Sequence, residues 1–160
     1  MFSDWLEEKY EDLFNQFEDL LNSSYLQNED IDTIDWCGTF YEYGLDFSYV
    51  AIDTYKDMNE GFWRYQISTG GPGSEYRIYV DMNNNIERIE FWFLDWFDGA
   101  SISVPKDSAS FQACYMQLDM ACFEHMTEIK SYEALYIDAM QQDDDSLADY
   151  YADEIHNILP

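Results

Sequence analysis

Few residues of this 160-residue chain combine the types and the spacing that nucleophilic chemistry needs. Cys122 and His125 are three positions apart, so on a helix a thiol and an imidazole would share one face, as in an activated nucleophile. The apolar residues around them favour a structural role for the pair instead. His156 is the second of only two histidines, which leaves little for acid–base catalysis. We therefore expect a protein that is not an enzyme.

The glycine-rich stretch from Gly70 to Gly73 could form a phosphate-binding loop or a turn between two strands. A phosphate-binding loop must lead into a helix, whose N-terminal amides and a nearby lysine contact the anion. Here the stretch leads into SEYRIYV, which has the composition of a strand, and no lysine follows. The sequence therefore predicts a hairpin connection and no cofactor.

Three consecutive aspartates, Asp143, Asp144 and Asp145, carry the charge that a hard cation prefers. A calcium loop alternates its acidic ligands with other residues and has a glycine at the sharp turn, and this run does neither. We expect weak, non-specific binding of Mg²⁺ or Ca²⁺ at most, and no dedicated metal site.

The segment 131–160 concentrates acidic residues and contains no lysine or arginine. Asp145, Asp149 and Asp153 are four positions apart, so on a helix they rise along one face about 6 Å from one another. Such a row of charge predicts a surface that binds a partner. The candidate contact residues of this segment are Asp143, Asp144, Asp145, Asp149, Asp153 and Glu154.

The segment 4–22 predicts an amphipathic helix capped by Ser3. Its apolar residues recur at three- and four-residue steps, and its acidic residues fall on the opposite, outer face. The candidate contact residues on that face are Asp4, Glu8, Glu11 and Glu18.

The stretch LDWFDG places Asp95 and Asp98 on either side of Trp96 and Phe97, just before Gly99. It could be the end of a strand, or a rim that presents carboxylates and aromatic rings to the lysine and arginine side chains of a partner. Both interpretations stay open, and Asp95 and Asp98 join the candidate contact residues.

The elements that position these residues follow from the hydrophobic periodicity. Runs rich in aromatic and β-branched residues predict strands, at 36–44, 45–55, 61–69, 74–81 and 86–97. Trp63, Tyr65 and Ile67 would share one face of their strand, as would Tyr76, Ile78 and Val80 of the next. The asparagine-rich stretch 81–87 predicts a tight turn. The strand at 86–97 has apolar residues on both faces, which is typical of a central strand.

After Pro105 the period becomes helical. The residues from Phe111 to His125 predict one helix with an apolar face, and two more are expected near 131–141 and near 146–158, the last capped by residues 143–146. The chain is therefore predicted to be an α+β protein. An antiparallel meander of about four to five strands would be flanked by an N-terminal helix and C-terminal helices in a single domain, 1–160.

The charge balance restricts the partners most strongly. Thirty-four acidic residues oppose seven basic ones, for a net charge of −27. This balance excludes direct nucleic-acid binding, anionic membranes and acidic substrates, and it favours a basic protein surface. Adaptation to high salt is the alternative explanation. A homodimer, which would extend the charged surface, is left open.

The cellular setting follows from three further features. Three cysteines without metal spacing fit a reducing compartment. The N-terminus has no basic and apolar leader, and no apolar run approaches the ~20 residues of a membrane span. We expect a cytoplasmic protein.

In size, charge and acidic helices such as 4–19 and 143–154, the chain resembles the DNA-mimic inhibitors of phages and plasmids, among them anti-restriction and anti-CRISPR proteins. A compact chain of this length is about 40 Å across, and that length of duplex carries about 24 charges, close to the −27 found here. The resemblance implies a non-catalytic inhibitor that occupies the DNA-binding surface of a nucleic-acid-binding protein or defence complex. These inhibitors share no motif, so it assigns no residue roles.

The stretch STGGPGSEYRIYVD, with the later IERIEFWFLDWFDGA, also resembles a small family of plasmid-borne accessory proteins, which implies a mobile genetic element. Two alternative functions remain. An immunity protein that neutralises a basic nuclease toxin would use one concentrated acidic patch with aromatic anchors such as Trp96 and Phe97. A small hydrolase would use a pocket lined by His125 or a pair of carboxylates. A DNA mimic instead predicts carboxylates in two rows across an elongated face.

Overall fold

The computed structural model describes residues 46–68, 73–95 and 98–160, together with nine positions near the N-terminus: 4, 7, 8, 11, 12, 14, 15, 18 and 19. Those nine positions all have helical backbone. The residues between them lie outside the described part, so the predicted helix at 4–22 is not shown as a continuous element. The predicted strand at 36–44 also lies outside it.

Five strands form one antiparallel sheet in the order β1-β2-β3-β4-β5, so the predicted meander is confirmed. The strands are β1 (Asp46–Val50), β2 (Phe62–Ser68), β3 (Gly73–Val80), β4 (Ile86–Asp95) and β5 (Asp98–Ser103). β2 and β3 are antiparallel neighbours, as expected for a hairpin, and residues 69–72 of the glycine-rich connection lie outside the described part. Between β3 and β4, the carboxylate of Asp81 accepts hydrogen bonds from the amides of Asn83 and Asn85, both at 2.9 Å, and closes the predicted turn.

The alternation of side chains gives the sheet one face that belongs to the core. Trp63 and Tyr65 of β2 are buried on it, and so are Tyr76 and Ile78 of β3. Phe91 of β4 packs against Tyr76, with ring centroids 4.8 Å apart. β4 lies between β3 and β5 and has partly buried residues on its other face, which confirms the prediction of a central strand.

Three helices follow the sheet: α2 (Ala109–Ala121), α3 (Met126–Gln141) and α4 (Asp145–Ile158). The last matches the prediction and is capped by Asp144, whose carboxylate accepts a hydrogen bond from the Leu147 amide. α3 begins five residues earlier than the predicted 131. The predicted helix that would carry both Cys122 and His125 is wrong, because α2 ends at Ala121 and Cys122 adopts a left-handed conformation with φ 48°.

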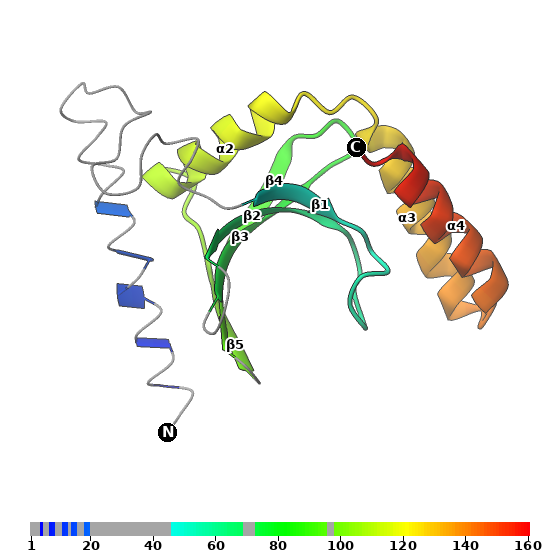
Figure 1. Cartoon of the computed structure of the whole chain (residues 1–160), viewed down its shortest axis with the longest axis horizontal. Coiled ribbons are helices and arrows are strands. Elements are labelled where there is room, and N and C mark those ends of the chain that lie inside the picture. Colours follow the sequence, from blue (N-terminus) through cyan, green and yellow to red (C-terminus); the bar gives the residue numbers. More distant parts are fainter. Residues whose placement is uncertain are drawn as a thin grey trace.

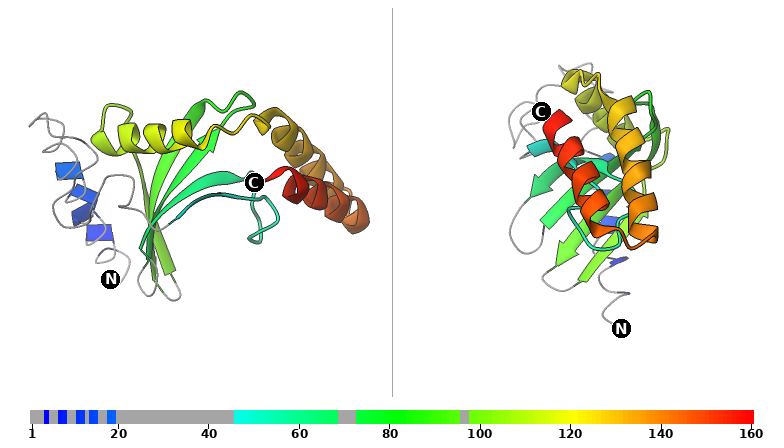
Figure 2. Two further views of the ribbon diagram at one scale, coloured as in Figure 1. Left: turned by 45° about the horizontal axis from the view of Figure 1, so that its top comes forward. Right: turned by 90° about the vertical axis from the view of Figure 1, so that its right-hand side faces the viewer.

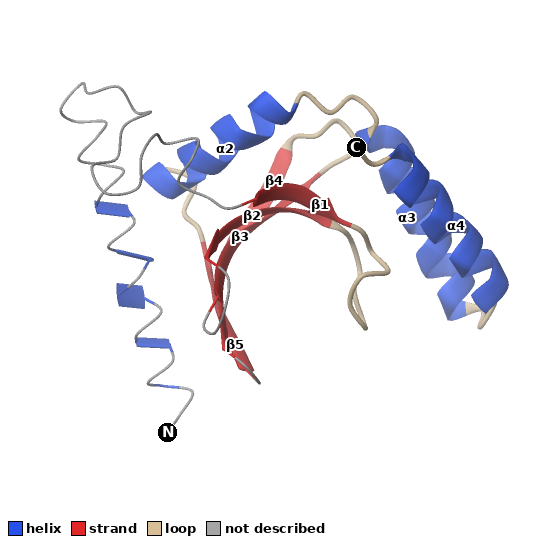
Figure 3. Ribbon diagram, viewed as in Figure 1, coloured by secondary structure: helices blue, strands red, loops and turns tan. Residues whose placement is uncertain are grey.

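The sheet is strongly curved, and of the three helices α2 is the one on its convex side (Figure 1). α2 crosses that side, and α3 and α4 form an antiparallel hairpin beyond one end of the sheet (Figure 2). The described N-terminal positions lie at the opposite end, where Phe14 is buried against Phe91. Figure 3 shows that no described helix covers the concave face. None of the described helices has the length and apolar character that crossing a membrane would require.

Candidate functional site: an acidic helical hairpin

The helical hairpin α3–α4 contains all six candidate residues of the C-terminal segment. Small side chains at the helix contact, Ala139, Ala148 and Ala152, are buried and let the two helices pack closely. The turn between them is formed by the aspartates themselves: Asp143 has a φ of 55°, and the Asp144 amide donates to the Ala139 carbonyl at 2.9 Å. Aspartate tolerates the left-handed conformation better than most residues, so this run has a structural role in the turn.

The outer side of α4 presents the predicted row of carboxylates. Asp145, Asp149 and Asp153 are all exposed, and their spacing on one helix places them about 6 Å apart along its axis. Glu154 is partly buried beside Tyr132, whose pKa is raised by burial and by the charge of Glu154. Asp143 and Asp144 continue the exposed charge at the tip of the hairpin.

Among the residues that the structure describes, no ion pair joins a lysine or arginine to Asp145, Asp149 or Asp153. Within the described residues of the hairpin, Lys130 is the one Lys or Arg, and its side chain is only 12% exposed. Lys130 lies 3.2 Å from Glu133 and 3.8 Å from Glu60, so its charge is directed toward the sheet. The carboxylates of α4 therefore face solvent without a neutralising partner of that kind.

A buried glutamate joins the hairpin to the sheet. Glu133 of α3 is 4% exposed and accepts hydrogen bonds from the hydroxyl of Tyr49 and, at 3.1 Å, from the amide of Gly61. Burial, the charge of Glu133 and its hydrogen bond raise the pKa of Tyr49. Together with the ion pair to Lys130, these contacts fix the orientation of the hairpin at the β1–β2 end of the sheet.

Two further contacts support this joint. The Thr127 hydroxyl donates to the Met82 carbonyl at 2.8 Å, which ties the start of α3 to the β3–β4 turn. His156 of α4 lies 2.9 Å from Asp53, so that Nε2 bridges the second helix to the loop after β1. The acidic hairpin is thus held as a rigid projection, which is what a preorganised binding surface needs.

The N-terminal candidates lie apart from the hairpin, at the opposite end of the sheet (Figures 1 and 2). Asp4, Glu8 and Glu11 are exposed, as expected for the outer face. Glu18 differs from that expectation. Its carboxylate accepts hydrogen bonds from the amides of Ala109 and Ser110, at 2.7 and 2.8 Å, and so caps the N-terminus of α2.

The remaining candidates, Asp95 and Asp98, are paired directly across the β4–β5 hairpin. Trp96 and Phe97 lie outside the described residues, and so do the side chains of both aspartates. The structural interpretation of this stretch as the end of a strand is confirmed by the β4 and β5 boundaries. Its role as an aromatic and acidic rim stays a prediction.

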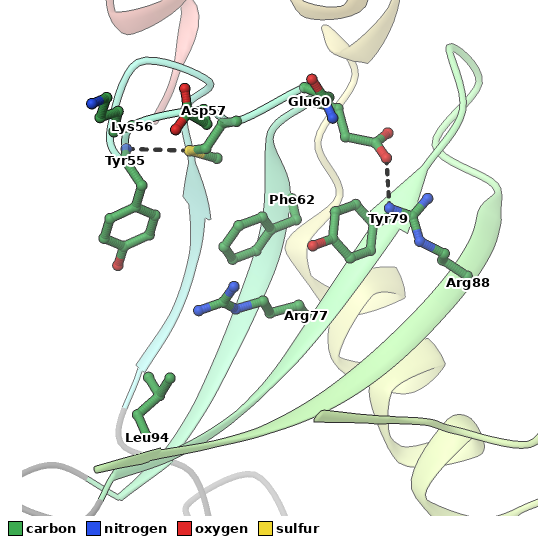
Figure 4. A pocket seen from close by; sticks show the side chains of 11 residues that line it. Tyr55, Lys56, Asp57, Glu60, Phe62, Arg77, Tyr79, Arg88 and Leu94 are labelled. Carbon is green, nitrogen blue, oxygen red and sulfur yellow. Dashed lines mark hydrogen bonds and ion pairs between the residues drawn. The ribbon is translucent and has the colours of Figure 1, made fainter. Parts of the chain in front are cut away.

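The three arginines lie on the face of the sheet opposite the core, and Figure 4 shows two of them, Arg77 and Arg88. Arg64 and Arg77 are register partners, and Arg88 lies over the ring of Tyr79, 3.7 Å from its centroid, so all three arginines of the chain share this face. Burial, together with the charge of Glu90, raises the pKa of Tyr79 to about 12.

Each of these arginines has a carboxylate partner: Asp46 at 3.9 Å from Arg64, Glu75 at 2.9 Å from Arg77, and Glu60 at 2.8 Å from Arg88. Arg77 also lies between two aromatic rings, 4.8 Å from the centroid of Phe62 and 4.1 Å from that of Trp92. A pocket of about 470 Å³ opens above these residues. Because each guanidinium group is already paired with a carboxylate, the positive charge of this pocket is neutralised locally and does not neutralise the carboxylates of the hairpin.

Among the described residues, no hydrogen bond joins Cys122 to His125, the pair considered for nucleophilic catalysis. Cys122 donates its thiol hydrogen to the Asp119 carbonyl at 3.2 Å, and His125 Nδ1 lies 3.1 Å from Glu128. Among the residues the structure describes, no group of three His, Cys, Asp or Glu side chains is arranged to hold a metal ion. Cys114 is buried, and burial followed by the nearby charge of Glu18 raises its pKa.

Sequence reasoning missed the roles of Glu133 and Glu18, which bind partners 72 and more than 90 positions away in the chain. It also missed several exposed apolar side chains on the hairpin. Leu135, Leu147 and Tyr150 are exposed on the same two helices as the carboxylates. For Glu133 the sequence contains one indication of burial: at helical spacing it falls on the same face as Met126 and Ile129, which are both buried.

No family model matches the chain, and neither a curated protein nor a solved structure matches it. A functional argument therefore rests on the charge, the geometry and the contacts described above.

Proposed function

We infer that this protein is a non-catalytic inhibitor that binds the DNA-contacting surface of a basic nucleic-acid-binding protein or defence complex. The α3–α4 hairpin is its principal contact surface. The observation that carries the proposal is the exposed row Asp145, Asp149 and Asp153 on a rigid projection whose only Lys or Arg among the described residues faces the sheet.

The physical basis is the similarity between carboxylates and phosphates as ligands of arginine and lysine. Both accept charge-assisted hydrogen bonds, and arginine can bind either in a bidentate manner. Charges about 6 Å apart on a helix give a repeat of phosphate-like spacing. A net charge of −27 would also accelerate association with a basic surface at low ionic strength.

The setting implied by the proposal is the cytoplasm of a cell that carries a phage or plasmid. Cys114 and Cys122 form no disulfide, in agreement with a reducing compartment.

One observation favours a second candidate, an immunity protein that covers the basic active site of a nuclease toxin. The exposed apolar residues Leu135, Leu147 and Tyr150 lie on the same hairpin as the carboxylates. Apolar anchors surrounded by charge are typical of a specific protein interface, because a central anchor supplies affinity that the charged rim does not.

The test is affinity capture from a host lysate on the immobilised full chain, eluted with a salt gradient, with duplex DNA as competitor. Capture of DNA-binding proteins that DNA displaces would support mimicry. A single partner that survives high salt and ignores DNA would favour the immunity protein. Failure to retain any basic protein would refute both.

A matched pair of variants assigns the surface. The triple change Asp145→Asn, Asp149→Asn and Asp153→Asn should weaken capture. The control removes the same number of charges from exposed positions elsewhere, by Asp107→Asn, Asp119→Asn and Glu124→Gln. Equal weakening by the two variants would show that net charge alone, and not the hairpin, determines binding.

A further inference from the structure

A groove of about 530 Å³ runs between the loop 51–60 and the second half of α3. The loop contributes the buried Ile52 and the partly buried Met58, and α3 contributes Tyr136, Ile137 and Met140. Met140 is 46% exposed, so the groove opens to solvent. Apolar walls of this kind accommodate the methylene stem of a long, charged side chain, whose head can remain at the mouth.

Two aspartates, Asp53 and Asp57, lie in the lining of this groove. Burial, followed by the charges of Asp53, Asp149 and Asp145, raises the pKa of Tyr136. The negative charges of the loop and of α4 therefore both act on this one aromatic ring. Asp53 is also the partner of His156. Lys56 is the lysine of the lining, and it is exposed.

We propose that this groove receives an arginine side chain of the basic partner, which stacks on Tyr136 and places its guanidinium at Asp53, Asp145 and Asp149. The planar guanidinium suits this site because it can stack on an aromatic face and donate to several carboxylates at once. The inference rests on the proposed function, since it names an arginine side chain as the group of the basic partner that binds at the hairpin.

Charge complementarity selects this occupant over an anionic ligand. The lining contains two aspartates, Asp53 and Asp57, and Asp53 contacts His156 of the acidic helix α4, in a chain of net charge −27. The neighbouring pocket of Figure 4 shares the loop but lies on the arginine-rich face, where Arg77 and Arg88 already have acidic partners. A cation is therefore attracted to the groove and has no such site in the pocket.

The test uses the full chain with ¹³C-methyl methionine, titrated with L-arginine amide and, for comparison, with L-citrulline amide, which has the same α-amino group but an uncharged, isosteric side chain. Two of the seven methionines, Met58 and Met140, line the groove. Met82 and Met120 are exposed but lie outside its lining, so they report non-specific binding. We expect saturable shifts of the Met58 and Met140 methyl signals with arginine amide and none with citrulline amide.

Two double variants that each lose two negative charges test whether Asp145 and Asp149 bind the guanidinium. Each charge about 6 Å from the guanidinium is worth about threefold in affinity in water, so Asp145→Asn with Asp149→Asn should weaken arginine binding about tenfold. The control, Asp119→Asn with Glu124→Gln, removes the same charge beside a different pocket and should weaken it less than about twofold, since the Debye length is about 8 Å.

Arginine shifts that spread equally over Met82 and Met120, equal effects of the two double variants, or no shift at Met140 would each overturn the proposal. The proposed function can fail separately. If the wild-type chain captures no basic protein from lysate while Met140 responds to arginine, the groove stands and the inhibitor function falls. If capture of basic proteins is strong and DNA displaces them, while arginine amide shifts neither Met58 nor Met140, the function stands and the groove falls.

Discussion

Replacement of Gly61 by alanine should disrupt the contact through which the α3–α4 hairpin is held to the sheet. A Cβ atom at this position would lie 2.5 Å from the Tyr49 hydroxyl oxygen and 2.6 Å from Oε1 of Glu133. These are the same two atoms whose hydrogen bond forms the joint, so the methyl group must force them apart. The Glu133 carboxylate, 4% exposed, would then lose part of its hydrogen bonding in a site with little water.

The expected cost is about 3 kcal/mol in the free energy of unfolding. A hydrogen bond to a charged group contributes about 1.5–3 kcal/mol, and overpacking of a well-packed site costs about 1–3 kcal/mol, with relaxation reducing the sum. For a chain of this length, such a loss lowers the melting temperature by about 6–12 °C. Urea denaturation followed by circular dichroism measures it, with a lower midpoint at an unchanged slope.

A matched glycine provides the control. At Gly99, in β5, the nearest atom to an added Cβ is the flexible Cδ2 of Leu94 at 3.3 Å, so Gly99→Ala should change the unfolding free energy by less than about 1 kcal/mol. Both replacements reduce the entropy of the unfolded chain equally. If Gly61→Ala proves no more destabilising than Gly99→Ala, the packed joint at Glu133 is refuted.

Three further perturbations test other contacts. Asp144→Ala removes the side chain that caps α4 and should cost about 1 kcal/mol by urea denaturation; a change below about 0.3 kcal/mol would refute the cap. Glu18→Gln weakens the charged cap on the first amides of α2 and should cost about 1–2 kcal/mol, and an unchanged midpoint would show that this contact does not form in solution. Stability should fall above pH ~10, where unfolded tyrosines ionise, because the raised pKa values of Tyr49 and Tyr79 keep both protonated in the fold. In Tyr49→Phe the free energy of unfolding should fall less steeply above pH 10, by about 1.4 kcal/mol per pH unit. Urea midpoints from pH 9 to 11 measure this dependence for both proteins. If both proteins lose stability equally with pH, Tyr49 does not have a raised pKa in the fold.

The strands β1 to β4 could be predicted because their causes are local, whereas β5 was not among the predicted strands. Alternation in β2 and β3 places Trp63, Tyr65, Tyr76 and Ile78 on one face, and all four are buried there. The turn at Asp81 needs only its own asparagines. α4 was placed correctly for a similar reason, since its cap and its apolar stripe lie within one short segment.

The break between α2 and α3 could not be read from periodicity. The apolar stripe continues through Cys122, and no glycine or proline marks the end of the helix. The chain turns there through Cys122 in the left-handed conformation. This conformation is unfavourable for cysteine and is kept only where the surrounding structure enforces it. A helical face shared by Cys122 and His125 was therefore an extrapolation across a helix end.

The acidic residues divided into two groups that the sequence alone does not distinguish. Asp145 and Glu133 are both helical carboxylates, yet one is exposed and the other is buried against Tyr49. Glu18 falls on the acidic side of its helical pattern but contacts the start of α2, 91 positions along the chain. For Glu133 and Glu18, only tertiary structure decides that the carboxylate is not available for a partner, because each accepts hydrogen bonds from donors far along the chain.

The position of Lys130 within the joint has a consequence for proteolysis. It is the last residue of the chain after which trypsin can cut, since 131–160 contains no lysine or arginine. In the folded protein its side chain is 12% exposed within α3 and paired with Glu133 and Glu60, so cleavage at this bond must wait for local unfolding of the helix. The rate at which trypsin releases the peptide 131–160, followed by mass spectrometry, therefore reports the opening of this one joint, and Gly61→Ala should accelerate that release.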